Sequence, residues 1–126
     1  MTNEKMKFQN ENYDIKKRTY SFSLNVISFL QVLPKTYIYQ TVGKQLLRSA
    51  TSIGANIIEA QAASSKRDFQ NFLNHALKSA NETKYWLLLI RDSLGRKLNA
   101  VNTLLQEADE LSKILGASLL RLKGRK

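Results

Sequence analysis

Apolar residues recur at intervals of three and four along most of this 126-residue chain, which is the spacing of amphipathic α-helices. One proline and five glycines interrupt the pattern. Pro34 disfavours helical geometry in the residue before it, and Gly95 is the kind of residue that commonly closes a helix. We therefore predict an all-α protein whose four helices cover about residues 13–32, 37–63, 65–93 and 98–122.

The short connections between these helices predict how they pack. Sequential helices joined by a few residues run antiparallel, so we expect an up-down-up-down antiparallel four-helix bundle over residues 13–122. Ser65, with Asp68 three residues later, forms a capping-box-like pair that predicts the start of the third helix. Residues 1–12 and the basic tail 123–126 are expected to be disordered.

The second helix has almost no conventional solvent face. Its main apolar line, widened by Leu47 and Ile58, consists of Leu46, Ala50, Ile53, Ile57 and Ala60. The adjacent line consists of mostly small polar residues, namely Ser49, Ser52, Asn56 and Glu59. Because a helix facing water would carry Lys and Glu at such positions, we expect neighbouring helices to enclose this one.

Two other helices carry more apolar surface than one core can cover. The first helix has one apolar line of Tyr13, Tyr20, Leu24 and Ile27, and a second on the opposite side of Ile15, Phe22, Val26, Phe29 and Leu33. In the third helix, residues 85–90 are apolar around the full circumference. A contiguous exposed apolar patch usually marks an interface, so we expect the chain to self-associate.

Charge narrows the choice of partner. The chain has 20 Lys and Arg against 10 Asp and Glu, a net charge of +10, with a pI of about 10. Such a balance favours phosphate-bearing or acidic partners. Basic residues cluster at Lys16–Arg18, at two helix–helix turns and in the tail. The candidate nucleic-acid contacts are the residues at those two turns: Lys66, Arg67, Arg91, Arg96 and Lys97.

Aromatic side chains lie beside another cation at the first turn. Tyr37 and Tyr39 follow Lys35 by two and four residues. They can either stack on unpaired bases or pack at the start of the second helix, and the sequence leaves both open.

Enzyme chemistry has no support in the residues. The chain lacks cysteine, which excludes disulfides and thiolate chemistry, and its single histidine, His75, has no partner for a metal site. Gly54 stands alone inside a helix and makes no phosphate-binding loop. We predict no catalytic site, no metal and no cofactor.

Two carboxylates, Glu59 and Glu82, sit among uncharged helical positions and could serve as an acid–base pair. We favour a structural role, because a buried charge without a partner costs several kcal/mol, and either Arg48 or Lys84 could neutralise it. The predicted polar network that fixes helix register consists of Arg48, Ser49, Asn56, Glu59, Asn81 and Glu82.

The cellular compartment follows from what the chain lacks. The N-terminal twelve residues have no apolar run of the kind found in signal peptides, and the longest apolar run, residues 86–90, is too short to cross a bilayer. We expect a cytoplasmic protein with no membrane partner.

Residues 46–63, the Ser65-Lys66-Arg67-Asp68-Phe69 segment and residues 80–86 carry a family resemblance. The chain resembles, from about Tyr13 to Leu122, the four-helix-bundle proteins encoded in intervening sequences of bacterial 23S ribosomal RNA. The same family includes the accessory variability determinants of diversity-generating retroelements. The resemblance implies a small basic bundle that assembles as a ring, typically a pentamer, and contacts nucleic acid. It implies no known catalytic activity.

The residues and the resemblance together lead to one functional expectation. We expect a non-enzymatic, homo-oligomeric helical scaffold that binds RNA or DNA electrostatically and assists a mobile-element process such as reverse transcription. A reverse transcriptase is then a candidate protein partner. The alternative is a protein-interaction adaptor whose basic surface docks an acidic partner protein.

Overall fold

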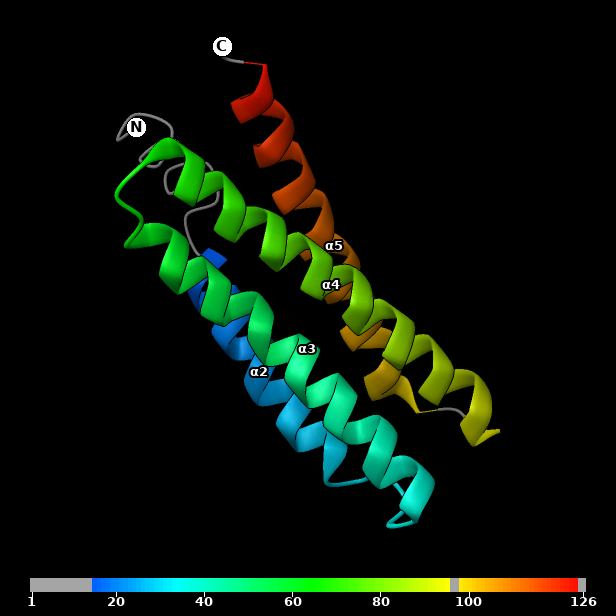
Figure 1. The fold of residues 1–126 in the computed structure, drawn as a ribbon. Coiled ribbons are helices and arrows are strands. Elements are labelled where there is room, and N and C mark those ends of the chain that lie inside the picture. The colour runs from blue at the N-terminus through cyan, green and yellow to red at the C-terminus, as the bar shows by residue number, and fades with distance from the viewer. Residues whose placement is uncertain (1–14, 96–97, 125–126) are drawn as a thin grey trace.

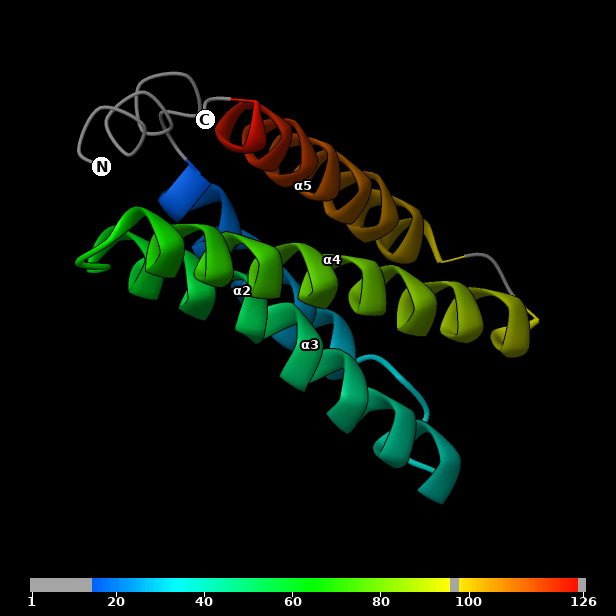
Figure 2. The ribbon, with the colours of Figure 1, turned by 45° about the horizontal axis from the view of Figure 1, so that its top comes forward.

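The computed structural model describes residues 15–95 and 98–124, which form four α-helices joined by short loops. The helices are α2 (Ile15–Leu30), α3 (Tyr37–Gln61), α4 (Lys66–Leu94) and α5 (Asn99–Lys123). Figures 1 and 2 show them running alternately up and down in one bundle, which confirms the predicted architecture. The predicted helix start at Tyr13 and the predicted disorder of residues 1–12 lie outside the described residues. The predicted disorder of the tail is wrong at Lys123, which is the last residue of α5.

Helix ends follow local backbone chemistry. The Ser65 hydroxyl accepts a hydrogen bond from the Asp68 N–H at 3.1 Å, and the Thr36 hydroxyl accepts one from the Tyr39 N–H at 3.3 Å. Both satisfy donors that the first turn of a helix leaves free. Gly95 follows α4 with a φ of 69°, the left-handed conformation that glycine adopts at little cost. The predicted cap at Ser65 and stop at Gly95 are confirmed, and every described boundary falls within two residues of its prediction.

The core is built from one apolar line on each helix. Neighbouring helices contact one another in the order α2–α3, α3–α4, α4–α5, and α5 closes the bundle against α2. The buried line of α2 is the one that begins at Ile15. The largest fully buried side chains are Phe22, Phe69, Ile15, Leu46, Ile53, Ile57, Leu73, Leu87, Ile90, Leu111, Leu115 and Val26.

The second apolar line of α2 stays outside this core. Tyr20, Leu24 and Ile27 are 67%, 48% and 42% exposed, on the side of α2 away from the bundle axis. Leu47 and Ile58 of α3 are also exposed. The expectation that neighbouring helices enclose α3 is therefore wrong on this side. The reason is that α2 covers only the inner edge of α3 and leaves an apolar strip between the two helices open.

Gly54 determines how closely α2 and α3 approach. A Cβ at Gly54 would lie 3.2 Å from Thr19 Oγ1 and 3.3 Å from Thr19 Cβ. Thr19 is buried, and its hydroxyl donates to the Lys16 carbonyl, so its position is held. The α2–α3 contact thus depends on the absence of a side chain at residue 54.

Gly54→Ala is expected to lower the free energy of unfolding by ~1 kcal/mol, because overpacking outweighs the gain in helix propensity. Gly116→Ala in α5 is the matched control. No atom lies within 4 Å of its added Cβ, so it should raise stability by ~0.5–1 kcal/mol. Urea unfolding followed by circular dichroism measures both, and equal gains from both substitutions would contradict the packing argument.

Candidate nucleic-acid interface

The structure separates the predicted basic contacts. Lys66 and Arg67 begin α4, whereas Arg91 lies in its last turn, and 25 residues of helix place the two ends about 38 Å apart. The Arg91 Nε atom donates to Asp92 Oδ1 at 2.9 Å, so part of its charge is already neutralised. Arg96 and Lys97 lie outside the described residues. Lys66, Arg67 and Arg91 therefore do not form one continuous surface.

Positive charge is concentrated on the α2–α3 half of the bundle instead. Residues 15–63 contain six Lys and Arg against a single acidic residue, Glu59. The described residues from 66 to 124 contain eight Lys and Arg against six Asp and Glu, which nearly balance. The positive electrostatic potential of the folded bundle is thus strongest over α2, α3 and the loop that joins them.

Two arginines of the α2–α3 half are engaged in ion pairs. Arg18 Nη2 lies 2.6 Å from Glu107 Oε1 and 3.0 Å from Glu110 Oε1, which ties α2 to α5. These hydrogen bonds, that of Glu107 above all, raise the pKa of Arg18 above its already high ordinary value although partial burial opposes the shift. Arg48 Nη2 lies 3.0 Å from Glu82 Oε2.

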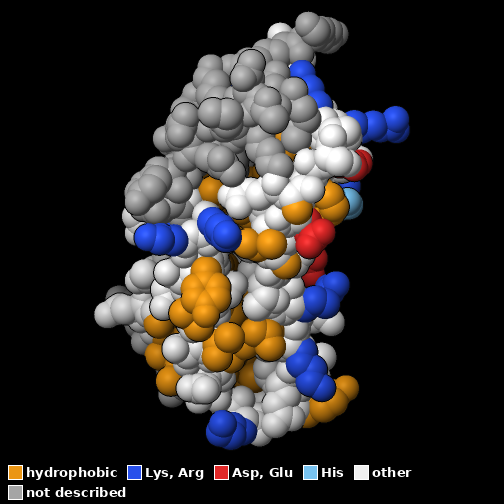
Figure 3. All heavy atoms as spheres, turned by 90° about the vertical axis from the view of Figure 1, so that its left-hand side faces the viewer, with side chains coloured by type: hydrophobic (Ala, Val, Ile, Leu, Met, Phe, Trp, Pro, Cys, Tyr) orange, Lys and Arg blue, Asp and Glu red, His pale blue; other side chains and the backbone are white. Residues whose placement is uncertain are grey.

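Four lysines of this half are not neutralised by any described acidic residue. Lys16, Lys17, Lys35 and Lys44 are exposed and form no ion pair with any described residue. Figure 3 shows the corresponding side of the bundle, on which hydrophobic side chains gather between Lys and Arg side chains and acidic ones lie at one margin. This is the surface best suited to an anionic ligand among the described residues.

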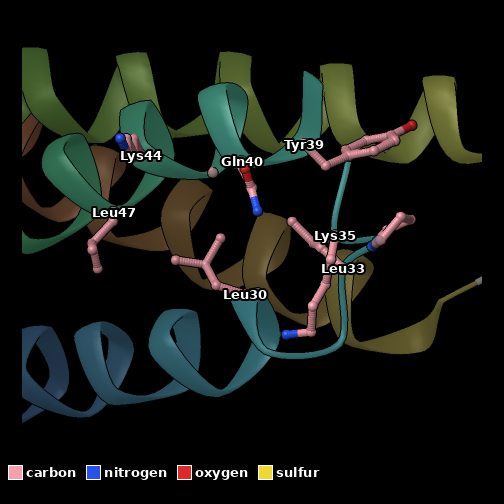
Figure 4. Close-up of a pocket in the computed structure, with 9 residues that line it drawn as sticks. Leu30, Leu33, Lys35, Tyr39, Gln40, Lys44 and Leu47 are labelled. Atoms are coloured by element: carbon pink, nitrogen blue, oxygen red, sulfur yellow. The ribbon is translucent and has the colours of Figure 1, made fainter. Parts of the chain in front are cut away.

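A groove runs along this surface between α2 and α3, and we refer to it as the α2–α3 groove. Its wider hollow, of about 700 Å³, is lined by Lys16, Lys17, Thr19, Tyr20, Ser21, Ser23, Thr51, Gly54, Ala55 and Ile58. A narrower hollow, of about 300 Å³, is lined by Leu30, Leu33, Pro34, Lys35, Tyr39, Gln40, Gly43, Lys44 and Leu47. Figure 4 shows Leu30 and Leu47 facing the space between the two helices. Neither hollow is lined by an acidic residue.

The two tyrosines of the first turn differ in their surroundings. The Tyr39 hydroxyl hydrogen-bonds to the Ser93 hydroxyl at 2.8 Å, which joins α3 to the end of α4. In Figure 4 its ring points away from Lys35 and Lys44. Tyr37 is 81% exposed. Packing is therefore the role that the structure supports for Tyr39, whereas Tyr37 remains accessible to a ligand.

Small hydroxyl groups fill the seam between α3 and α4. The Thr83 hydroxyl lies 2.9 Å from Ser49 Oγ and 2.7 Å from the Ser79 carbonyl oxygen. Ser79 donates to Ser52 Oγ at 2.9 Å, and the Asn56 amide donates to Ser52 Oγ at 3.0 Å. Thr83 and Ser49 are buried. The hydrogen bonds between α3 and α4 fix the register of the two helices.

The charged members of the predicted network occupy the edge of this seam or lie outside it. Glu82 accepts from Arg48 and from the Trp86 indole, the latter at 2.9 Å. Glu59 and Asn81 are exposed, and neither side chain forms a hydrogen bond or an ion pair with a described residue. Of the six predicted members, the structure gathers Arg48, Ser49, Asn56 and Glu82 along the α3–α4 seam and leaves Glu59 and Asn81 on the surface.

Lys84 forms an ion pair with Asp109, whereas the sequence analysis considered it as a partner of Glu59 or Glu82. Its Nζ atom donates to Ser112 Oγ at 3.0 Å and to Asp109 Oδ1 at 3.4 Å, which ties α4 to α5. Lys113, above all, and Lys84 hold the pKa of Asp109 below its ordinary value.

The described residues offer no group of three or more His, Cys, Asp or Glu that could hold a metal ion. His75 is exposed on α4. No helix in the described ranges is long and apolar enough to cross a membrane.

A model of the 23S rRNA-intervening sequence protein family matches residues 11–117. The chain belongs to this family. No curated protein matches it. Among solved structures, the chain is similar to a protein of unknown function from the S23 ribosomal protein family of Bacteroides thetaiotaomicron, with 36% sequence identity and a TM-score of 0.77. The match covers 83% of this chain and 97% of the other.

This member of the intervening-sequence family shows a feature that its sequence had not singled out. Lys16, Lys17 and Tyr20 of α2 line one hollow of the α2–α3 groove, and Lys44 of α3 lines the other. Basic residues that are neighbours in the chain lie at the helix turns, whereas this surface combines residues of two helices. The available signal was the absence of Asp and Glu between Ile15 and Ile58.

Thr83→Val is expected to lower the free energy of unfolding by ~1–2 kcal/mol, because it removes the central hydroxyl of the buried α3–α4 seam. Glu59→Gln should change it by less than ~0.5 kcal/mol, as exposed positions without partners generally do. Chemical denaturation of both variants measures the difference. If Glu59→Gln lowered the free energy of unfolding as much as Thr83→Val does, Glu59 would have a structural role after all.

Proposed function

We propose that this protein is a non-enzymatic, oligomeric helical scaffold that binds RNA or DNA through electrostatic contacts with phosphates. The supporting observation is the uneven charge of the bundle, with six cations and one acid over residues 15–63. Lysines without acidic partners lose few internal contacts when they bind phosphate, and they release counterions from the nucleic acid.

The proposed assembly uses a different surface, the outer face of α4. Tyr85, Leu88 and Leu89 share this face at helical spacing and are 58%, 40% and 40% exposed. Two cations near this face are paired, Arg91 with Asp92 and Arg48 with Glu82, whereas Lys78, two turns before Tyr85, has no acidic partner among the described residues. An apolar surface that presents few unpaired cations suits contact between copies that each carry a net charge of +10.

The α2–α3 groove is less suited to contact between copies, because its unpaired lysines would face further positive charge. Separate surfaces for assembly and for binding allow each copy to add its lysines to a shared basic band. A ring provides such a band, and the family resemblance suggests five copies. We propose a cytoplasmic setting within a mobile-element process, in which a reverse transcriptase is the candidate protein partner.

Fluorescence anisotropy of labelled RNA and DNA across a salt series tests the binding function. The logarithm of the binding constant should fall linearly with log salt, with a slope steeper than about −2, since each neutralised phosphate contributes roughly 0.7–0.9. Absence of binding at moderate salt would contradict the proposal. Salt-resistant binding of an acidic protein would then favour the adaptor function.

Leu89→Lys is expected to reduce the assembled protein to a single chain of 14.4 kDa, because it places a charge in the centre of the apolar face of α4. Leu120→Lys is the control, since it makes the same change at an apolar residue of α5 that is 73% exposed. Size-exclusion chromatography with light scattering measures the mass. A wild-type mass of one chain, or equal effects of both variants, would exclude the α4 face as the assembly surface.

A further inference from the structure

We propose that the α2–α3 groove is a site for single-stranded nucleic acid, in which unpaired bases contact its apolar floor and Tyr20 while phosphates contact the lysines at its rim. This inference rests on the proposed nucleic-acid function and adds both the site and the class of ligand. The principal nucleic-acid contacts are then residues of the groove, in place of the basic residues that the sequence analysis named at the helix turns.

The floor of the groove is apolar because its side chains are small or carry methyl groups. Gly54, Ala55, Thr51 and Ile58 of α3 line the wider hollow, and their small size contributes to its volume of about 700 Å³. Such a floor offers van der Waals contact to apolar groups. The faces of nucleobases are apolar, so they can pack against it.

Three hydroxyl groups of the wider hollow, those of Thr19, Ser23 and Thr51, are poor phosphate ligands. Thr19 donates its proton to the Lys16 carbonyl at 3.1 Å, Ser23 donates to the Thr19 carbonyl at 3.1 Å, and Thr51 donates to the Leu47 carbonyl at 2.7 Å. Each of these hydroxyls has one proton, and it donates that proton to a backbone carbonyl of its own helix. A phosphate oxygen needs a donor, whereas the N–H groups of a base need an acceptor, which these oxygens still offer.

Lys16 and Lys17 supply the donors that phosphates require. They precede Tyr20 by four and three residues on α2, a spacing at which side chains of a helix are neighbours. Tyr20 is 67% exposed and lines the same hollow. A base stacked on Tyr20 would therefore hold its flanking phosphates within reach of these lysines.

The narrower hollow extends the same path. Lys44 and Lys35 line it, and eleven residues of α3 separate Lys44 from Ala55, a distance of about 16 Å along the helix axis. A strand of a few nucleotides can span this length with lysines at both ends. Positively charged grooves with exposed aromatic rings are the usual means of binding single strands with little sequence preference.

A double helix would use this surface less well. Its bases are stacked inside, so it can present phosphates to Lys16 and Lys17 but cannot place a base against Tyr20 or the floor. A second copy of the chain would bring its own net charge of +10 to four unpaired lysines. Charge and shape together favour an anionic ligand with exposed flat groups, which is a single strand.

The test compares a labelled 12-nucleotide single strand with a 12-base-pair duplex of the same sequence, using the full chain and fluorescence anisotropy. Tyr20→Leu keeps an apolar side chain but removes the ring, and should weaken single-strand binding about 5- to 100-fold. Tyr20→Phe keeps the ring and should bind within about threefold of wild type. Duplex binding should be unchanged by either. Since Tyr20 is exposed, the bundle should fold, which a thermal melt verifies.

The lysines are tested by the double substitution Lys16→Gln and Lys17→Gln. Losing two phosphate contacts should reduce the slope of log binding constant against log salt by about 1.4, which is twice the 0.7 expected per phosphate of a single strand. Lys78→Gln is the control, because Lys78 is also exposed but lies on α4. It should leave the slope close to the wild-type value, because a lysine outside the groove makes no phosphate contact.

The possible outcomes distinguish failure of the groove site from failure of the proposed nucleic-acid-binding function. If wild type binds nucleic acid but Tyr20→Leu binds as tightly, the groove is not the base site although the scaffold function stands. If wild type binds neither strand nor duplex, the proposed function itself fails. If Tyr20→Leu or the double lysine variant changes the assembled mass, the groove is an interface between copies, and the inference is wrong.

Discussion

A four-helix bundle has one core, and α2 of this chain carries two apolar lines on opposite sides. That constraint decides most of what the surface can do. The line of Phe22, Val26 and Phe29 is buried, and the line of Tyr20, Leu24 and Ile27 is therefore left outside. Since exposed apolar area is retained at a cost in solubility, its position beside unpaired lysines indicates a surface that meets another molecule.

The two sides of α3 show how the chain controls which surface stays open. Towards α4, hydrogen-bonded hydroxyls of Ser49, Ser52 and Thr83 fill the seam and fix its register. Towards α2, Gly54 brings the backbones together at one point and leaves the outer edge hollow. The same helix thus provides a closed structural seam on one side and a groove on the other.

The sequence predicted the fold well because helix ends depend on local chemistry. Ser65 and Gly95 mark their helix ends through local hydrogen bonding and backbone conformation. Which of the two apolar lines of α2 is buried was not predicted, and only the packed bundle shows that it is the line beginning at Ile15. The candidate site was less accessible. Whether Lys84 pairs with Glu82 or with Asp109 depends on how α4 rotates against α5, which periodicity does not specify. The grouping of Lys16, Lys17 and Tyr20 with Gly54 and Ile58 around one hollow likewise exists only after α2 and α3 pack.

Crosslinking tests the central claim, that the α2–α3 groove holds unpaired bases, most directly. A 12-nucleotide RNA containing 4-thiouridine would be irradiated in complex with the wild-type protein, and crosslinked residues would be located by mass spectrometry. The account predicts crosslinks at Tyr20 and at neighbouring groove residues of α2 and α3, and none at Tyr85 on the outer face of α4. Crosslinks confined to the α4 face or to the turn at Lys66 and Arg67 would contradict it.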